Sequence, residues 1–349
     1  MPQFQNFTSE DKIVETQKVT KGFFTGDVGT ATAFQTASLS ASQKEYYLNM
    51  QLNGGTADEF SVSYGSYHGS ASSDTPVGQT KAVYWSMANL LLFPTELESQ
   101  GFSFRTSAST KVSAGDVFFI TAERARMKDR LNRKNWTLQL SGSGPHPTSA
   151  SLLHLTDDSD SVVATPTPVG PRYNVVSGTL GNVVVSAATR TYGHFYPNLG
   201  IIALDGHALS HSIGGAHVDS GSTLVKTTVT GNGFGKGYAT AKNTEHYKLA
   251  TAIMKGAGFT LRNEEDKLST QYFVRAKAAH WNFSVNPTFS SGSIDATFRI
   301  DEMTGNPTTF PTTIGLYDGG NNMVAVGRLS GAKVKSFTDE IIAKVILDH

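Results

Sequence analysis

The chain contains Val117-Phe118-Phe119-Ile120-Thr121 and, after a basic segment, Trp136-Thr137-Leu138-Gln139-Leu140. Both runs are rich in aromatic and aliphatic residues over the length of one strand, so they predict two buried strands. The connector between them, residues 122–135, is dense in arginine and lysine. The sequence therefore predicts a strand, a basic connector and a second strand, around which the rest of the chain is organised.

Acidic residues are interleaved with the basic ones in this connector, at Glu123 and Asp129. A nucleic-acid module usually shows a basic excess over its whole domain, which this chain lacks. Because a guanidinium group can make two hydrogen bonds to one carboxylate, we expect a salt-bridging clamp, within the fold or against a neighbouring subunit, in which the arginines pair with acidic groups. The expected clamp residues are Arg124, Arg126, Lys128, Arg130, Arg133 and Trp136.

The composition indicates a mainly β protein that carries little charge. Charged residues make up 17% of the 349 residues, against about 25% in a typical globular protein, and Ser, Thr, Asn and 34 glycines take their place. The formal net charge is zero, so we expect neither nucleic acid nor a membrane surface as a partner and a low barrier to self-association. Cysteine is absent, which excludes disulfides, thiolate zinc sites and cysteine nucleophiles.

Short alternating runs predict antiparallel, β-sandwich-like domains with about two short helices. The apolar spacing predicts helices at 80–93 and 244–255, the first of them ended by Pro94. Expected strands include 46–52, 60–67, 102–105, 152–155, 173–178, 196–206, 272–278, 313–317, 323–327 and 341–347. The expected division of this multi-domain chain is an N-terminal arm at 1–45, β-rich domains at 46–142 and 143–260, and a segment at 261–349 that returns to the first domain.

The candidate chemical sites are weak. His207 and His211 have i, i+4 spacing and could share a metal on a helical turn, but no carboxylate joins them at ligand spacing. The Ser and Gly residues around them, as far as His217, favour a loop without metal. Asp157, Asp158 and Asp160 lack the pattern of a calcium loop and predict a solvated turn. We therefore expect no catalytic residue, no cofactor and no enzymatic activity.

Several stretches, in order along most of the chain, resemble the virion structural proteins of contractile-tailed, myovirus-type bacteriophages, especially those of marine cyanobacterial phages. They include Lys21-Gly22-Phe23-Phe24-Thr25-Gly26 and Tyr173-Asn174-Val175-Val176-Ser177-Gly178-Thr179. The others are 60–65, 82–84, 90–92, 117–142, 200–204, 272–275, 281–287 and 313–348. The resemblance implies a non-enzymatic tail component, in the baseplate or near the attachment of fibres, and supplies no catalytic residues.

The resemblance also implies the partners and the location. We expect other virion tail proteins as partners, several copies or a homo-oligomer in the particle, and assembly in the host cytoplasm. Three alternatives stay open at this point. The chain could occupy another virion position, such as the neck, collar or capsid surface. It could be a carbohydrate-binding adhesin or tail-fibre component, although a host glycan is not expected. It could also degrade polysaccharide, which would require two facing carboxylates in a cleft.

Overall fold

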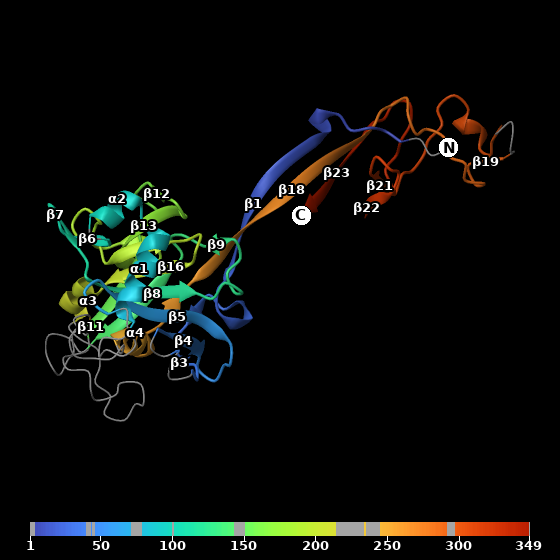
Figure 1. Cartoon of the computed structure of the whole chain (residues 1–349). Helices are drawn as coiled ribbons and strands as arrows, with labels where there is room; N and C mark the ends of the chain where they lie inside the picture. The colour runs from blue at the N-terminus through green and yellow to red at the C-terminus, as the bar shows by residue number, and fades with distance from the viewer. Residues whose placement is uncertain are drawn as a thin grey trace. The chain divides into compact units, whose positions relative to one another are not determined.

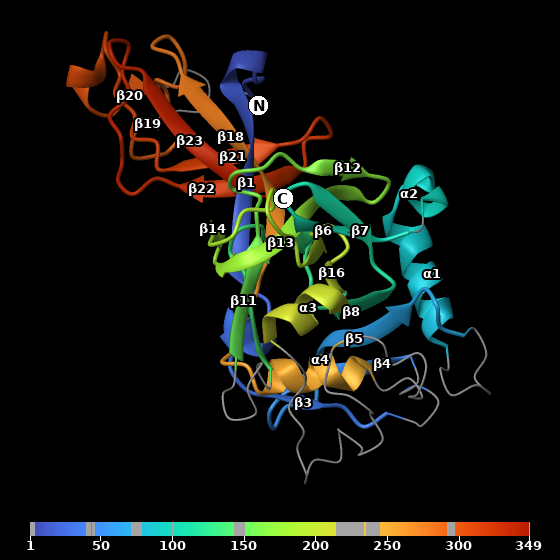
Figure 2. The same cartoon turned by 90° about the vertical axis from the view of Figure 1, so that its left-hand side faces the viewer.

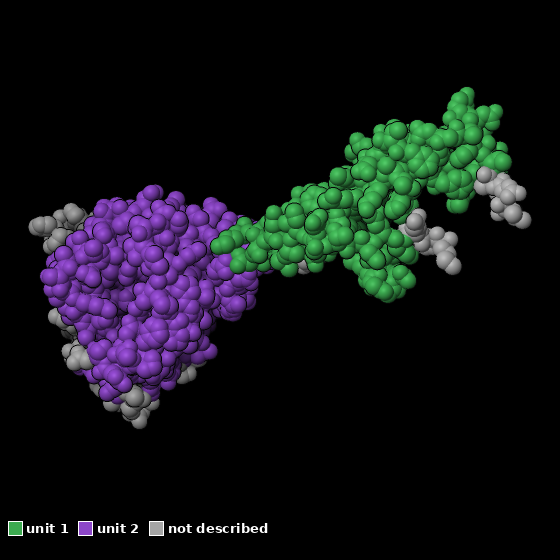
Figure 3. Space-filling view, turned by 90° about the horizontal axis from the view of Figure 1, so that it is seen from above, with its two compact units in different colours: residues 1–18, 266–349 green, residues 19–265 purple. Residues whose placement is uncertain are grey.

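A computed structural model describes most of the chain, and it divides into two compact units. Unit 1 comprises Met1–Lys18 and Asp266–His349, and unit 2 comprises Val19–Glu265 (Figure 3). The described residues are 4–39, 43, 46–70, 79–99, 101–142, 151–213, 234, 245–291 and 297–348, without the side chain of Ser151. Every strand pair whose residue register is defined is antiparallel. The prediction of a mainly antiparallel β, multi-domain fold is confirmed.

One large, nearly closed sheet forms unit 2 (Figure 1). Its two end strands, β2 and β3, are separated by only two residues of the chain, so the sheet curves round until its ends are adjacent. In spatial order the strands are β2 (Thr30–Ala31), β17 (Phe259–Thr260), β10 (Thr137–Gly142), β11 (Ser151–Asp157), β13 (Gly170–Thr179), β15 (Gly193–Tyr196), β16 (Ile201–Asp205), β8 (Asp116–Ala122), β5 (Asp58–Ser66), β4 (Tyr47–Leu52) and β3 (Phe34–Thr36), while β12 (Thr165–Thr167) and β14 (Asn182–Val183) pair with β13.

Strand β8 is buried on both faces. Phe118 and Ile120 contribute to one apolar cluster, whereas Val117 and Phe119 contribute to another on the opposite face. Successive side chains of a strand point to opposite faces, and a strand covered on both faces reads as an unbroken apolar run. This burial explains why the stretch from Val117 to Ile120 contains no polar residue.

The outer apolar cluster lies under two helices, α1 (Thr80–Leu91) and α2 (Pro94–Glu98). Tyr84 of α1 is fully buried, and its hydroxyl donates to the carbonyl of Ala114 and accepts from the amide of Phe102, both at 3.0 Å. Gly65 permits this approach, because a Cβ there would lie 2.7 Å from the Tyr84 Cα. The first predicted helix is thus confirmed, but Pro94 begins the next helix, where its missing amide hydrogen is not needed.

The inner cluster contains two further helices, α3 (Gly206–Ile213) and α4 (Glu245–Met254). Helix α4 contacts β10 as well as β3, β4 and β5, strands far apart in the order of the sheet, so it lies within the curve of the sheet (Figure 2). Its apolar residues pack there with Phe60 and Phe259. The second predicted helix is confirmed over 245–254, and Thr244 lies outside the described residues.

Unit 1 consists of a three-stranded sheet and small hairpins. The sheet has the order β1 (Lys12–Gly22), β18 (Arg262–Ala276) and β23 (Ile341–Asp348), and the start of β18 pairs within unit 2 with β9 (Arg130–Leu131). The hairpins are β21 (Thr313–Tyr317) with β22 (Met323–Arg328) and β19 (Ser290–Ser291) with β20 (Thr297–Phe298). The predicted C-terminal hairpin and final strand are therefore confirmed.

The remaining strands of unit 2 form a small hairpin, β6 (Ser103–Ser107) with β7 (Thr110–Ser113). Short 3-10 turns lie at Ser9–Asp11, Thr25–Asp27 and Asp301–Met303. Among the residues that the structure describes, no helix is long and apolar enough to cross a membrane.

The domain boundaries differ from those expected. The boundary expected between 142 and 143 falls between β10 and β11, which pair directly with Leu138 opposite Leu155. The expected arm at 1–45 supplies β1, β2 and β3. Most of the segment expected at 261–349 groups with residues 1–18 instead of with 46–142. The two units arise from pairing between strands that are distant in the sequence. The local Gly, Ser and Pro content, which suggested a boundary near 142, carries no information about such pairing.

The inner core of unit 2 gives a direct stability test on β11. Leu155 is fully buried and Leu152, on the same strand, is 56% exposed. We expect Leu155→Ala to lower the free energy of unfolding by about 2–5 kcal/mol, because it leaves a cavity. Leu152→Ala should change it by less than about 0.5 kcal/mol. Urea denaturation followed by tryptophan fluorescence measures both, and equal losses would contradict the assigned burial.

Candidate functional site

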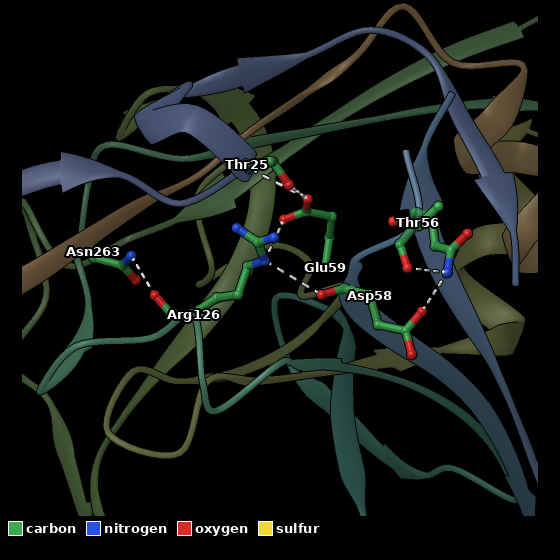
Figure 4. Close-up of polar contacts among 7 residues, drawn as sticks. Thr25, Thr56, Asp58, Glu59, Arg126 and Asn263 are labelled. Carbon is green, nitrogen blue, oxygen red and sulfur yellow. Dashed lines mark hydrogen bonds and ion pairs between the residues drawn. The ribbon is translucent and has the colours of Figure 1, made fainter. Parts of the chain in front are cut away.

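The basic connector between β8 and β10 is fastened to a buried carboxylate through Arg126 (Figure 4). The Nε of Arg126 lies 3.2 Å from Oε2 of Glu59, whose side chain is fully buried. The same Nε donates to the carbonyl of Asp58 at 3.4 Å. Thr25 completes the site, because its amide donates to Oε1 of Glu59 at 3.3 Å and its hydroxyl donates to the same atom. Asn263 holds the backbone, donating to the carbonyl of Arg126 at 2.8 Å.

A second ion pair fastens the connector four residues later. The Nε and Nη2 of Arg130 donate to one oxygen of Glu264 at 2.8 and 2.6 Å. Asn132 donates to the other oxygen of that carboxylate at 2.5 Å. Glu264 is buried and lies at the start of β18, opposite Arg130 in the strand register. This geometry ties the connector to a segment more than a hundred residues further along the chain.

The other expected clamp residues divide into two groups. Arg133 donates to the hydroxyl of Tyr173 and places its guanidinium carbon 5.4 Å from the centre of that ring. Trp136 is fully buried, 5.2 Å from the ring of Phe195. Arg124 and Lys128 are exposed and form no ion pair with a described residue. The structure shows the expected pairing with acidic groups for Arg126 and Arg130. For Arg124 it shows none within the described part of the chain, and pairing with a neighbouring subunit stays a prediction.

An open recess of about 610 Å³ lies beside this clamp, within unit 2. Charged residues of both signs line it: Lys21, Asp27, Asp58, Glu123, Arg126 and Lys128. The carboxylate of Asp58 accepts from Asn49 at 2.5 Å and from Gln51 at 2.7 Å. The recess also includes Phe23 and Phe24, but both rings are at most 2% exposed, so they offer no face for a ligand to stack on. The recess is suited to a polar contact with balanced charge.

The histidine candidates lie on α3, which corrects the expected loop. His207 and His211 are both exposed on this helix, and His217 lies outside the described residues. Among the described residues no group of three or more His, Asp or Glu side chains could hold a metal. The sequence signal that was missed is the apolar spacing of Ala208, Leu209 and Ile213, all of which are buried. These residues bury one side of the helix in the inner core.

Asp205 begins this helix as its N-cap. Its Oδ1 accepts the backbone amide of His207 at 3.1 Å, in the geometry that satisfies a free amide at a helix start. Burial raises the pKa of Asp205 to about 6, against the opposing effect of amide hydrogen bonds and of His207. The nearby Asp116 raises it further and accepts a hydrogen bond from Tyr64. Both carboxylates therefore have structural hydrogen-bond partners.

The acidic turn after β11 is also structural and mostly buried. Asp157 accepts the amide of Lys134 at 2.9 Å, and Asp158 accepts the amide and the side chain of Asn174 at 3.0 and 2.7 Å. Burial raises the pKa of both carboxyls. Only Asp160 is exposed, where it pairs with Lys134. The expected solvated turn is therefore wrong for the first two residues: Asp157 holds the far end of the connector, and Asp158 holds Asn174 of β13.

Comparisons with known proteins identify no relative. No family model matches the chain, and neither a curated protein nor a solved structure was found to be similar to it. The resemblance to phage virion proteins therefore rests on the ordered stretches of the sequence alone.

Substitutions of Arg126 and Arg124 test the clamp, because only the first should lower the free energy of unfolding. Arg126→Gln leaves the buried carboxylate of Glu59 without its cation. An exposed ion pair contributes about 0–1 kcal/mol and breaking a buried one costs about 3–5 kcal/mol, so we expect a loss of about 2 kcal/mol for this partly exposed pair. Arg124→Gln is the matched control and should have almost no effect. Chemical denaturation measures both, and the double variant Arg126→Gln with Glu59→Gln should regain part of the loss.

The raised pKa of Asp205 makes a prediction about pH. In the folded chain the carboxyl holds its proton up to about pH 6, whereas in the unfolded chain it releases the proton near its ordinary pKa of about 3.9. Between these two pKa values the folded state binds more protons than the unfolded state. The contribution of Asp205 to the free energy of unfolding is therefore fully present below about pH 4 and is lost as the pH rises to about 6.

Asp205→Asn keeps a good N-cap and removes the titration. We expect its free energy of unfolding to vary less between pH 4 and pH 6 than that of the native chain, by on the order of 2 kcal/mol. Denaturation curves at several pH values measure this difference. Parallel pH profiles for the two proteins would contradict the assignment.

Proposed function

We propose that the chain is a structural subunit of a contractile bacteriophage tail, in the baseplate, and that unit 1 makes its contacts with neighbouring subunits. The observation that carries this proposal is the lack of an apolar core in unit 1. Among the described apolar residues that are buried, only Pro307, Leu316 and Ala343 belong to unit 1, and all the others belong to unit 2. Unit 2 can therefore be stable by itself, whereas unit 1 lacks the usual source of stability.

Many apolar residues on the strands of unit 1 are exposed. The most exposed on its strands are Ile342 at 63%, Val326 at 62%, Val324 at 61% and Met323 at 59%. Large exposed apolar patches in a folded protein mark surfaces that bind other proteins. The outward faces of β22 and β23 are thus suited to contact with a partner.

Polar contacts hold unit 1 together inside. The amino group of Lys335 is buried and donates to the carbonyls of Ala278 and Ser336 and to the side chain of Asn282, at 2.7–2.9 Å. Arg275 pairs with Asp11 at 2.8 Å. Such bonds define a shape but contribute little net stability, about 0.5–1.5 kcal/mol each. A two- or three-stranded sheet without a covered apolar face is marginal in water, so covering by a partner would stabilise it.

The position in the baseplate is supported by the resemblance of the ordered sequence stretches to phage tail proteins. The proposed partners are other tail proteins of the virion, in which several copies of the chain assemble without enzymatic activity. The adhesin alternative is weakened at the recess beside Arg126, since sugar-binding grooves need exposed aromatic faces and Phe23 and Phe24 are buried. The neck, the collar and the capsid surface are the competing positions in the particle.

Fractionation of the particles tests this proposal. Phage particles that contain the chain are separated into heads and tails, and each fraction is probed with an antibody raised against the purified chain. We expect the chain in tails stripped of heads, and in baseplates after the tail tube and sheath are removed. Detection only on heads would overturn the tail assignment, and detection in neither fraction would overturn the structural role.

A further inference from the structure

The last strand of unit 1 has an open edge. Strand β23 is at the end of its sheet, paired on one side with β18. No backbone hydrogen bond joins its other side to a described residue. An exposed edge strand presents unpaired amide and carbonyl groups, which form a template for another strand. The residues of this edge therefore determine which strand can add to it.

The two halves of this edge have different surroundings. Residues 341–344 line an open recess of about 340 Å³ together with Leu329, Lys333 and Val334 of the same chain. Residues 345–348 do not line it. The second half of the strand is therefore the part that another strand can approach over several residues.

Three side chains at this end of β23 lie on one face of the sheet: Lys344, which borders the recess, Ile346 and Asp348. They alternate along the strand, and the Lys344 amino group lies 6.0 Å from the centre of the ring of Phe273, its partner in the register. Ile346 is 51% exposed. Lys344 and Asp348 are exposed, and neither forms an ion pair with a described residue. The face thus carries a cation, an apolar centre and an anion at equal spacing.

We propose that a second copy of this chain adds to this edge, with the two β23 strands antiparallel and centred on Ile346. A twofold axis perpendicular to the sheet then places Ile346 opposite Ile346 of the other copy. Lys344 lies opposite the other copy's Asp348, and the same pair forms a second time by symmetry. Two sheets of three strands become one sheet of six, in an isologous contact of the kind that closes a dimer. This inference rests on the proposed role of unit 1 in assembly.

Charge selects this register over its neighbours, because like charges directly opposite each other destabilise a strand pair. A parallel arrangement in register places Lys344 beside Lys344 and Asp348 beside Asp348. An antiparallel arrangement centred on Lys344 places the two lysines opposite each other and Asp348 opposite Glu340. Centring on Val345 leaves both charges opposite isoleucines. Only centring on Ile346 gives each charge an opposite partner.

The absence of cysteine from the chain allows a direct test of the register. Ile346→Cys in the full-length protein places two thiols opposite each other, with Cα atoms about 4.5–5.5 Å apart, which is within disulfide range. We expect a covalent dimer on a non-reducing gel after mild oxidation. Ile342→Cys is the matched control, because Ile342 is exposed on the same face, at 63% against 51% for Ile346. Its two thiols lie far apart in the same dimer, so this variant should run as a monomer on the gel. Equal cross-linking of both variants, or of neither, would overturn the register.

A charge exchange tests the pairing independently. Lys344→Asp and Asp348→Lys each create two like-charged pairs across the contact, and we expect each to weaken dimerisation by about tenfold or more in analytical ultracentrifugation. The double variant restores both attractions with reversed polarity and should recover the native affinity. Circular dichroism verifies that the three variants fold alike. A double variant no better than the single ones would overturn the pairing.

The two proposals fail in different ways. A chain that stays monomeric at all concentrations but still co-purifies with phage tails overturns the β23 contact and leaves the structural role intact. A chain that forms the Ile346-centred dimer but is missing from tails and heads supports the contact and overturns the virion assignment.

Discussion

Burial of β8 on both faces is the constraint on which the structure of unit 2 depends. Its even-numbered residues Phe118 and Ile120 face the inner cluster with α3 and α4, while Val117 and Phe119 face the outer cluster under α1. Each cluster includes the side chains of one face of this strand. The neighbouring strand β16 is divided in the same way, with Ile202 inside and Ala203 outside. Two layers of helices are therefore organised around one pair of strands.

The connector that follows β8 is held by carboxylates from three separate parts of the chain. Glu59 comes from β5, Asp157 from the end of β11 and Glu264 from the start of β18. Each is buried, and a buried carboxylate requires a cation or several hydrogen-bond donors. The connector supplies them through Arg126, Arg130 and the amide of Lys134. Arg126 and Arg130 are thus explained by buried carboxylates of the protein, and no ligand is needed to explain these two residues.

The two units differ in how they obtain stability. Unit 2 encloses its apolar side chains, as a self-sufficient domain does. Unit 1 carries apolar side chains on exposed strands and surrounds Lys335 with carbonyls. Covering these strands by neighbouring subunits would supply the burial that the isolated unit lacks, at the same time as it joins the subunits. A chain built in this way suits an assembly in which subunits become stable as they join, which is the physical basis for the proposed virion role.

The sequence by itself determined the fold class and the position of most elements. Alternation and apolar runs predicted the strands at 117–121 and 136–140, and apolar spacing predicted helices at 80–93 and 244–255, which the structure shows over 80–91 and 245–254. These features depend on residues close together in the chain, which a local pattern reports. The sequence also predicted that arginines of the connector pair with acidic groups, because charge and spacing can be read without a structure.

Only the tertiary structure decided which distant segments meet. Glu59 and Glu264 are no different in sequence from other acidic residues, and their roles come from pairing with β8 and β9. The misplaced domain boundary near 142 has the same cause, since β10 and β11 are joined across a Gly- and Pro-rich segment. Residues 206–213 form a helix where the sequence predicted a loop, because Asp205 caps the helix and the inner core buries one side of it. Burial and long-range pairing are properties of the folded chain, so local sequence could not reveal them.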